Sequence, residues 1–472
     1  MSIVPAQITA GEDAFALVKA LTEGLESHNQ ANFEANAYYE ANKKLGTPGF
    51  AVPAEVAGRI APVTGAPGIV VDVLEERLDF TGWDDSGATS YGLDAIYDEN
   101  ELDFESSLAH LDALVFGTSF VRVGRSESSD TPLITVHSPM TTTGVRNPHT
   151  RRLDAAWTTL LVKDGRSERG VLDLADASIT LRRSGSAWVI EDVDEHGMGR
   201  VPVVQFANRA RASRPGGRSE ITRGIRSLTE DMMRAGLGMN VNSMFYSIPQ
   251  LMLLGRGPDA FKDRNGNPVA GWKILAGHAL AIDKDEDGDA PDVKQLTTAS
   301  PTPFIDQLRE FRMQIAAEAG MPADYLGIQT SNPSSADAIR AGEARLVKRA
   351  ERRQATFGRS WMEVARLALL VRDGEIPADF NSRVTAEWQS AATPTRAATA
   401  DEVTKLVGAN ILAPDSVVTR KRLNLSRSEE RALEAEARRN AGRSLVESLI
   451  ATPAPPAQDV TPQVAADAAG RS

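Results

Sequence analysis

The sequence predicts an α+β protein in which long helices surround an antiparallel β-region. Apolar residues recur every three to four positions in several long stretches, which is the period of a helix with one buried face. Between residues 118 and 207 the period changes to two, as it does in half-buried strands. The chain has 472 residues, of which 42% are hydrophobic, so it can bury more than one core.

The composition excludes several kinds of protein. The chain has no cysteine, which rules out disulfides, cysteine catalysis and Cys-ligated metal sites and suits assembly in a reducing cytoplasm. Its formal net charge of −12 argues against tight, static binding to duplex DNA, although not against a surface past which DNA moves. No apolar run reaches the ~18 residues that span a bilayer, and the start, MSIVPAQITAGEDAF, lacks the features of a signal peptide. We therefore expect a protein that is neither secreted nor embedded in a membrane.

Helices are predicted for the N-terminal part of the chain. Residues 11–45 carry apolar residues on one side, namely Leu17, Val18, Leu21 and Leu25. After a loop with four prolines, a helix is expected over 69–83, because Val70, Leu74 and Leu78 fall four apart. Another helix is expected over 103–116 with Gly117 as its C-cap, and its buried face is predicted to carry Phe104, Leu108, Leu111 and Val115.

An antiparallel β-region is predicted from Thr118 to Ala207. Turn residues separate six segments that alternate in polarity: SFVRV, LITV, AWTTLLV, SITLRR, SAWVIED and VPVVQF. Strands this short, joined by short turns, pair with their neighbours in antiparallel fashion. The β-region is thus inserted between two sets of helices.

Two further helices bracket a small insertion. The first is predicted over Ser219–Ser247 with Ser219 as its N-cap, and its apolar stripe carries Ile221, Ile225, Leu228, Met232, Ala235 and Met239. The second is predicted to begin at Pro303 after Thr302 as N-cap and to end at Ala319, with Phe304, Leu308, Phe311 and Ile315 aligned. Residues 251–300 between them look like a small α/β unit with strand candidates in GWKILAGHALAI and PDVKQL.

A long helix with little apolar surface is predicted from Ser335 to about Arg372. The preceding loop ends in SNPSS, and Ser334 with Asp337 forms an approximate capping box. The first half is mostly charged, with Arg340, Glu343, Arg345, Arg349 and Arg352 among its residues, whereas the second half carries Phe357, Trp361, Val364, Ala365, Ala368 and Leu369. A helix that is polar nearly all round bridges domains, lines a solvent space or packs against copies of itself. Helical segments continue to about residue 450, and the Pro/Ala-rich tail 451–472 is expected to be disordered.

The candidate catalytic and metal-binding residues favour a protein that is not an enzyme. The six histidines are never at metal-ligand spacing, and phosphate-loop, dinucleotide-loop and nucleophile-elbow motifs are absent. Asp283, Asp285 and Asp287 resemble the start of a calcium loop, but Lys294 stands where that loop needs a glutamate, so an acidic turn is favoured. We therefore expect no enzyme activity and no cofactor.

Two other groups of residues have a structural and a nucleic-acid interpretation. The basic run Arg420, Lys421 and Arg422 could contact nucleic acid, but a solvated helix end is the favoured interpretation. Tyr38 and Tyr39 could stack on bases, but packing in a core or against a subunit is favoured for two tyrosines on one helix.

Several segments in order resemble one known family. They are NAYYEANKKL, VVDVLEERLDFTGW, NELDFESSLAHLDALVFGTSFVRV, VPVVQFANRARASRPGGRSEI, GMPADYLG and SNPSSADAIRAGEARLVKRAERRQATFGRSWMEVARLAL. Together they are similar to the portal proteins of tailed bacteriophages, of the SPP1 Gp6-like type that is common in phages of actinobacteria. The resemblance covers roughly Asn32 to Arg439, and its most specific part runs from Met321 to Leu370.

The resemblance implies a dodecameric ring at one vertex of the virion capsid. Terminase would pack double-stranded DNA through this ring, DNA would later leave through it, and major capsid, scaffolding and head-completion or adaptor proteins would bind it. The portal fold of wing, stem, clip and crown would divide the chain as follows: N-terminal region and wing 1–212, stem helix 213–250, clip 251–302, second stem helix 303–320, tunnel loop 321–334, crown helices 335–450 and tail 451–472.

The charged helix and the loop before it acquire a physical role in such a ring. Gln329, Thr330, Ser331 and Asn332 are small and polar, so DNA could slide past them without a fixed cationic anchor. Neighbouring subunits could supply counter-charges to the crown helix, and cyclic symmetry would repeat each contact. Two alternatives stay open: a virion adaptor or minor capsid protein that never encircles DNA, and a metal-dependent enzyme that uses the cluster from Asp283 to Asp289.

Overall fold

The computed structural model describes residues 12–46, 62–85, 90–126, 128–163, 166–185, 187–246, 250–254, 292–296, 300–328 and 336–392, and, with further gaps, 396–443. The chain divides into two compact units, Met1–Ala392 and Thr393–Ser472, which are described separately. Helices and antiparallel sheets are mixed within the first unit, which confirms the predicted α+β class.

The N-terminal helices differ from the prediction in their extent. One continuous helix, α1 (Glu12–Tyr39), replaces the helices expected up to Leu45, and it buries the predicted leucine and valine stripe. The helix expected over 69–83 is wrong in its second half, because α3 (Ala66–Glu75) is followed by a strand, β1 (Phe80–Asp84). Gly82 has φ +119°, which no helix accommodates, and β1 pairs with β12 (Thr385–Trp388) from the far end of the unit.

Helix α5 (Leu102–Phe116) follows α4 (Leu93–Glu99) and buries only part of the predicted face, since Val115 is buried and Leu111 packs against the core. Phe104 is 60% exposed and Leu108 37% exposed, whereas Ala109 and Ala113 are fully buried. The small residues let the helix approach β2 closely, and the Ser119 hydroxyl donates a hydrogen bond to the Ala109 carbonyl at 2.6 Å. Gly117 is the left-handed C-cap, as expected.

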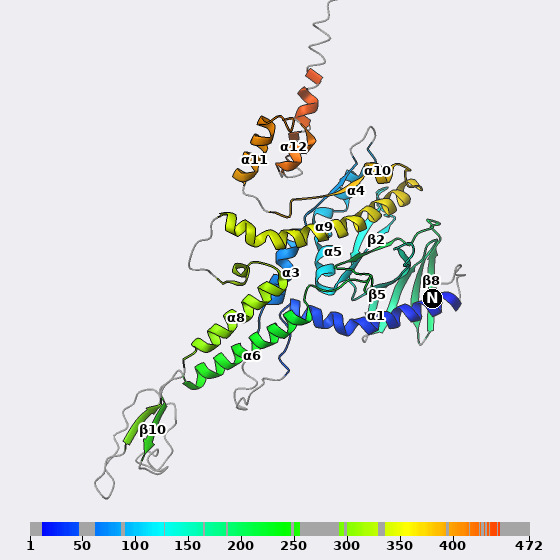
Figure 1. Cartoon of the computed structure of the whole chain (residues 1–472). Coiled ribbons are helices and arrows are strands. Elements are labelled where there is room, and N and C mark those ends of the chain that lie inside the picture. Colours follow the sequence, from blue (N-terminus) through cyan, green and yellow to red (C-terminus); the bar gives the residue numbers. More distant parts are fainter. Residues whose placement is uncertain are drawn as a thin grey trace, which may run out of the picture. The chain divides into compact units, whose positions relative to one another are not determined.

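The β-region forms two antiparallel sheets. Three strands run in the order β3-β2-β9, and five run in the order β4-β5-β6-β7-β8. Their bounds are β2 Thr118–Gly124, β3 Leu133–His137, β4 Thr142–Arg146, β5 Leu153–Lys163, β6 Arg166–Asp173, β7 Ser178–Ser184, β8 Ala187–Asp194 and β9 Val203–Ala207. The prediction missed β4 and β6. Helix α1 covers the five-stranded sheet with Leu17, Val18 and Leu21, which pack with Trp157 and Leu181 (Figure 1).

The two bracketing helices lie side by side in Figure 1 and pack on each other. They are α6 (Arg223–Tyr246) and α8 (Thr302–Ala319). Ile221, Ile225 and Met232 are buried, Leu228, Leu308 and Phe311 are half-buried against the same core, and Phe304 lies against Gly238. The predicted caps are wrong: Thr222 precedes α6 and its hydroxyl accepts from the Ile225 amide, while Pro301 precedes α8.

Between these helices the structure describes one strand pair. Strand β10 (Gln250–Leu254) pairs antiparallel with β11 (Asp292–Leu296). Strand β11 was predicted from the sequence, and strand β10 was not. The other strand candidate, GWKILAGHALAI, and the acidic residues from Asp283 to Asp289 lie outside the described residues.

The long charged helix is α9 (Ala336–Asp373), within two residues of its predicted bounds. All six apolar residues predicted for its second half are buried, and Trp361 stacks on Phe80 with ring centroids 4.8 Å apart. The unit ends with α10 (Phe380–Arg383) and β12. In the second unit, α11 (Arg396–Gly408) and α12 (Val417–Arg422) form, and Arg422 pairs with Glu402 at 2.8 Å.

A close backbone crossing at Gly217 is expected to tolerate no side chain. Gly217 is buried with φ +82°, and an added Cβ would lie 2.5 Å from the Asn208 carbonyl oxygen and even closer to that of Gly117. We expect Gly217→Ala to lower the free energy of unfolding by about 3 kcal/mol, measured by urea denaturation. Gly216→Ala is the matched control, because nothing lies within 4 Å of its added Cβ. Equal stability of the two variants would contradict the crossing.

Buried His110 is expected to make the fold sensitive to mild acid. Burial lowers its pKa to about 3, and a backbone hydrogen bond at Leu78 offsets only part of that effect. The unfolded chain binds a proton at this histidine below about pH 6.5, whereas the folded chain does not. The contribution of His110 to stability is therefore complete above about pH 6.5 and should fall by up to about 1.4 kcal/mol per pH unit below it. Burial raises the pKa of Glu75 to about 7, so Glu75 contributes with the opposite sign in this range.

Unfolding measured at pH 7.5, 6.5 and 5.5 checks this expectation. His110→Asn should reduce the fall in stability with falling pH. Part of the fall should remain, because burial also lowers the pKa of His137 and His196. His149→Asn, at an exposed turn, should leave the slope as in the parent. A slope that is the same in all three proteins would exclude His110 as its source.

Candidate functional site at the base of helix α9

A buried carboxylate holds α9 to the segment that leads into α6. Glu220 is 1% exposed, and its two oxygens each accept a hydrogen bond of 2.6 Å, one from Arg353 and one from Arg349. Asn208 donates to the same carboxylate at 3.1 Å and accepts from Arg353 at 3.2 Å. We call Glu220, Arg349, Arg353 and Asn208 the Glu220 cluster.

The electrostatics of the Glu220 cluster favour the ionised acid. Burial by itself raises the pKa of Glu220, but the charges of Arg353 and Arg349 more than offset it, so the pKa lies below its usual value. A buried charge is tolerable only when it is paired and hydrogen-bonded, and here both oxygens are satisfied. The Glu220 cluster therefore fixes the position of α9 relative to the segment that precedes α6.

A second network joins the two ends of the loop that precedes α9. Tyr325 lies in the short helix η2 (Ala323–Leu326), and its hydroxyl donates to Glu343 of α9 at 2.7 Å. Arg77 donates to the Tyr325 hydroxyl at 2.8 Å, to Glu343 at 3.2 Å and to the Ala391 carbonyl at 3.0 Å. Burial, and then the bond to Glu343, raises the pKa of Tyr325. We call Arg77, Tyr325 and Glu343 the loop clamp.

The loop clamp anchors the chain on both sides of residues 329–335. Leu326 and Ile328 are buried just before them, and Leu346 and Ala350 are buried on α9 after them. The carboxylate of Glu343 and the guanidinium of Arg77 are largely dehydrated, since their side chains are 20% and 6% exposed. The pairing is therefore worth more than a surface ion pair, and it holds the ends of the loop in fixed positions.

The predicted site residues divide into three groups. Gln329, Thr330, Ser331 and Asn332, and the side chain of Arg340, lie outside the described residues. Glu343 and Arg349 were expected to find counter-charges on neighbouring subunits, but they find them in the same chain. Arg345 and Arg352 are exposed.

Sequence reasoning missed the partners of these residues. Glu220, Arg353 and Arg77 carry the two networks, and Glu220 is separated from Arg353 by more than a hundred residues. No local pattern marks an isolated glutamate before a helix as the partner of a distant arginine. Tyr38 and Tyr39 hydrogen-bond to Glu230 and Asp72, which confirms their predicted packing role.

The described part of the chain contains no group of three or more histidine or acidic residues that could hold a metal ion. None of its helices combines the length and the apolar character that crossing a membrane requires.

Comparison with known proteins identifies the class and then the family. Antiparallel sheets, the long helix α9 and the paired helices α6 and α8 define a mixed helix and sheet protein. The family model described as "Phage portal protein, SPP1 Gp6-like" matches residues 77–442, and the chain belongs to this family of phage portal proteins, which are virion components.

The portal proteins of two mycobacteriophages agree with this assignment. The portal protein of Mycobacterium phage D29 is 32% identical over 399 residues, which cover 82% of this chain and 81% of the relative. The portal protein of Mycobacterium phage L5 is 30% identical over 408 residues, covering 84% and 83%. A solved structure, the neck of an empty GTA particle computed with C6 symmetry, matches with a TM-score of 0.43 and 12% identity, covering 78% of this chain and 90% of that chain.

Proposed function

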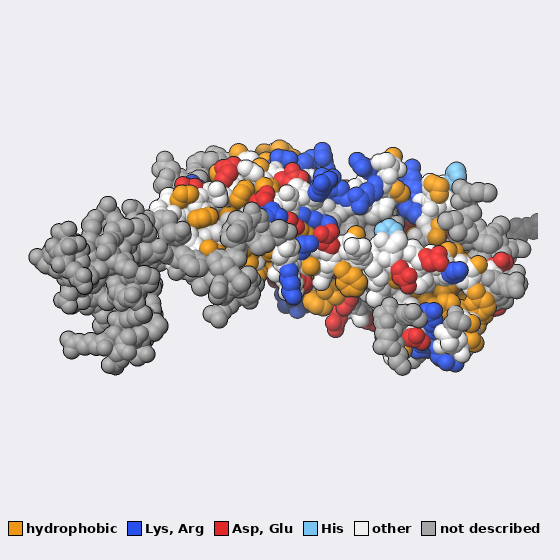
Figure 2. Space-filling view, turned by 90° about the horizontal axis from the view of Figure 1, so that it is seen from below, with side chains coloured by type: hydrophobic (Ala, Val, Ile, Leu, Met, Phe, Trp, Pro, Cys, Tyr) orange, Lys and Arg blue, Asp and Glu red, His pale blue; other side chains and the backbone are white. Residues whose placement is uncertain are grey.

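We propose that copies of this chain form a closed ring at the portal vertex of the capsid, through which double-stranded DNA is packaged by terminase and later ejected. The observation that carries the proposal is the incomplete burial of α8. Its buried residues are Ile315, Ala316 and Ala319 near one end, whereas Ile305 is 53% and Met313 39% exposed. Figure 2 shows further apolar side chains at the surface of the face it draws. Neighbouring copies around a closed symmetry axis would cover such residues.

The tunnel loop 321–334 is the proposed constriction of the channel. The loop clamp joins Tyr325, before Gln329, Thr330, Ser331 and Asn332, to Glu343, after them. The absence of Lys and Arg from these four positions leaves no fixed anchor for phosphates. The net charge of −12 further limits adhesion of DNA to the ring.

The remaining assignments follow from the order of the elements. We assign residues 1–212 to the wing, α6 and α8 to the stem, 251–302 to the clip and 335–450 to the crown of a dodecamer. Terminase and head-completion proteins would bind at the clip, and capsid and scaffolding proteins around the wing. The exposed Arg345 and Arg352 of α9 are the crown residues that would face a neighbouring subunit.

The alternative is an adaptor or minor capsid protein that does not encircle DNA. Negative-stain microscopy of the purified chain separates the two functions. A ring with a hole wide enough for a duplex supports the portal function, whereas monomers or rings without a central hole would exclude it.

A charge introduced into the loop is expected to stall DNA. Thr330→Arg, repeated in every subunit of the ring, would create a basic collar that binds phosphates. We expect packaged DNA per capsid to fall about tenfold or more, and the loss to be greater at low salt, where counterion release is strongest. Packaged DNA is measured in an in-vitro packaging reaction, with ring assembly checked by sedimentation.

Thr330→Ala is the matched control for this experiment. It should package at the parental rate, because the loop acts by its position and its lack of charge. If Thr330→Arg forms normal rings and packages at the parental rate at low salt, the loop does not face the DNA.

A further inference from the structure

A pocket with an arginine rim lies between α9 and the two sheets. Its volume is about 920 Å³, and its floor is formed by Leu153, Val201, Val203 and Leu367, all of which are buried. Five arginines line it against two carboxylates, Asp154 and Glu363. The pocket therefore combines an apolar floor with an excess of positive charge.

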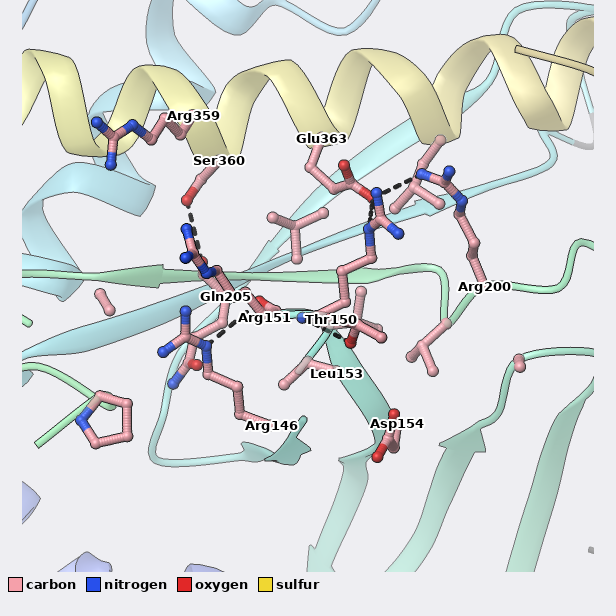
Figure 3. A pocket seen from close by; sticks show the side chains of 18 of the residues that line it. Arg146, Thr150, Arg151, Leu153, Asp154, Arg200, Gln205, Arg359, Ser360 and Glu363 are labelled. Carbon is pink, nitrogen blue, oxygen red and sulfur yellow. Dashed lines mark hydrogen bonds and ion pairs between the residues drawn. The ribbon is translucent and has the colours of Figure 1, made fainter. Parts of the chain in front are cut away.

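The arginines of the pocket are of two kinds. Glu363 neutralises Arg152 at 2.6 Å and Arg200 at 2.9 Å, and Asp154 accepts hydrogen bonds from Asn147. Arg146, Arg151 and Arg359 are exposed, and among the described residues no carboxylate pairs with them. Figure 3 shows their guanidinium groups on one side of the pocket, away from Glu363 and Arg200. An occupant of the pocket would meet three uncompensated charges there.

The same chain carries a surface of the opposite character. Residues 93–116, which span α4 and α5, contain seven acidic residues and no Lys or Arg. Glu101 and Asp103 are exposed beside Phe104 and Leu108, and Leu133 of β3 is 48% exposed. Asn100 fixes this arrangement, because its side chain binds the Pro132 carbonyl at 2.9 Å and the Ile134 amide at 2.7 Å. We call Glu101, Asp103, Phe104, Leu108 and Leu133 the acidic knob.

The pocket and the acidic knob lie at opposite edges of one sheet. The strand order is β3-β2-β9; β9 contributes Val203, Val204 and Gln205 to the pocket, and β3 contributes Leu133 to the knob. A surface at one edge cannot reach the other edge of the same copy. It can reach that edge on the next copy, and contacts of this head-to-tail kind close into rings.

We propose that the acidic knob of each copy docks into the arginine-rimmed pocket of the next copy. Phe104 and Leu108 would cover the apolar floor, and Glu101 and Asp103 would pair with Arg151 and Arg359. Duplex DNA fits less well, because it has no apolar group that would enter the floor. The inference rests on the proposed ring and names the surfaces that build it.

Charge reversal with a mixing experiment tests the contact. The pocket variant carries Arg151→Glu with Arg359→Glu, and the knob variant carries Glu101→Arg with Asp103→Arg. Each variant alone should dissociate from rings at a protein concentration about tenfold or more above that of the parent, because like charges then meet. A chain with all four changes should recover much of the loss.

The mixing experiment distinguishes this contact from a general loss of stability. Neither variant alone has a complementary pair of surfaces, but in an equal mixture the acidic knob meets the arginine pocket and the reversed knob meets the reversed pocket, so rings should reappear in analytical ultracentrifugation. Arg182→Glu, at an exposed position of β7, should form parental rings. Circular dichroism confirms that each variant is folded.

The outcomes separate the two proposals. If the parent forms rings and both reversed variants form them equally well, the docking contact is wrong while the portal ring stands. The docking contact is also wrong, and the portal ring stands, if the pocket variant forms parental rings and loses only its affinity for a 30-base-pair DNA duplex. A parent that stays monomeric at every concentration overturns the ring and the contact together.

Discussion

Replacing Glu220 with Gln should destabilise the chain by about 3–5 kcal/mol, because the buried Arg353 and the partly buried Arg349 then lose their counter-charge. Glutamine keeps the size of the side chain, so the loss reports charge rather than a cavity. Arg353 is 7% exposed and cannot recover its hydration by a small movement. The measurement is the free energy of unfolding from urea denaturation at pH 7.5, followed by circular dichroism.

The pH dependence provides a second test of the Glu220 cluster. A carboxyl with a lowered pKa stabilises the fold above its unfolded value of about 4.5 and loses that effect as the pH falls through its folded value. The parent should therefore lose the stabilisation supplied by ionised Glu220 only below about pH 4.5. Glu220→Gln cannot lose it, so its stability should fall less between pH 4.5 and lower pH.

Glu191→Gln is the matched control for the Glu220 variant. Glu191 pairs with Arg169 at 2.7 Å, but both side chains are well exposed. The change should cost at most about 1 kcal/mol. A Glu220 variant as stable as this control would show that the cluster does not fix α9.

Replacing Trp361 with Ala should cost about 4 kcal/mol or more. The side chain is fully buried between Phe80, Phe206 and His110, so its removal leaves a large cavity. Its ring nitrogen donates to His110 at 2.9 Å, and the loss leaves a buried acceptor without a partner. Thermal unfolding measures the stability, and sedimentation shows whether the variant still forms the proposed ring.

Two other substitutions separate these contributions. Trp361→Phe keeps most of the packing and removes the hydrogen bond, so it should fall between the parent and Trp361→Ala. Trp188→Ala, at a half-buried position of the five-stranded sheet, should cost clearly less. If Trp361→Ala costs no more than Trp188→Ala, the aromatic cluster is not the centre of the main core.

The sequence by itself determined the elements whose signal is local. The alternation between 118 and 207, the apolar second half of α9 and the stripes of α6 and α8 each repeat within one or two turns, and the structure contains all of them. The family resemblance also arose from short local segments, and the match over 77–442 confirms it. Local periodicity survives in the folded chain because it sets which face each element can bury.

Only the tertiary structure decided the features that depend on distant partners. Phe80–Asp84 looked helical by spacing, but it became a strand because residues 385–388 pair with it. Helix α5 buried its alanines and exposed Phe104, because a close approach to β2 outweighed the larger apolar residues in this copy. Glu220 found Arg353 across the fold, and the burial of that pair, rather than any spacing in the sequence, gives it its strength.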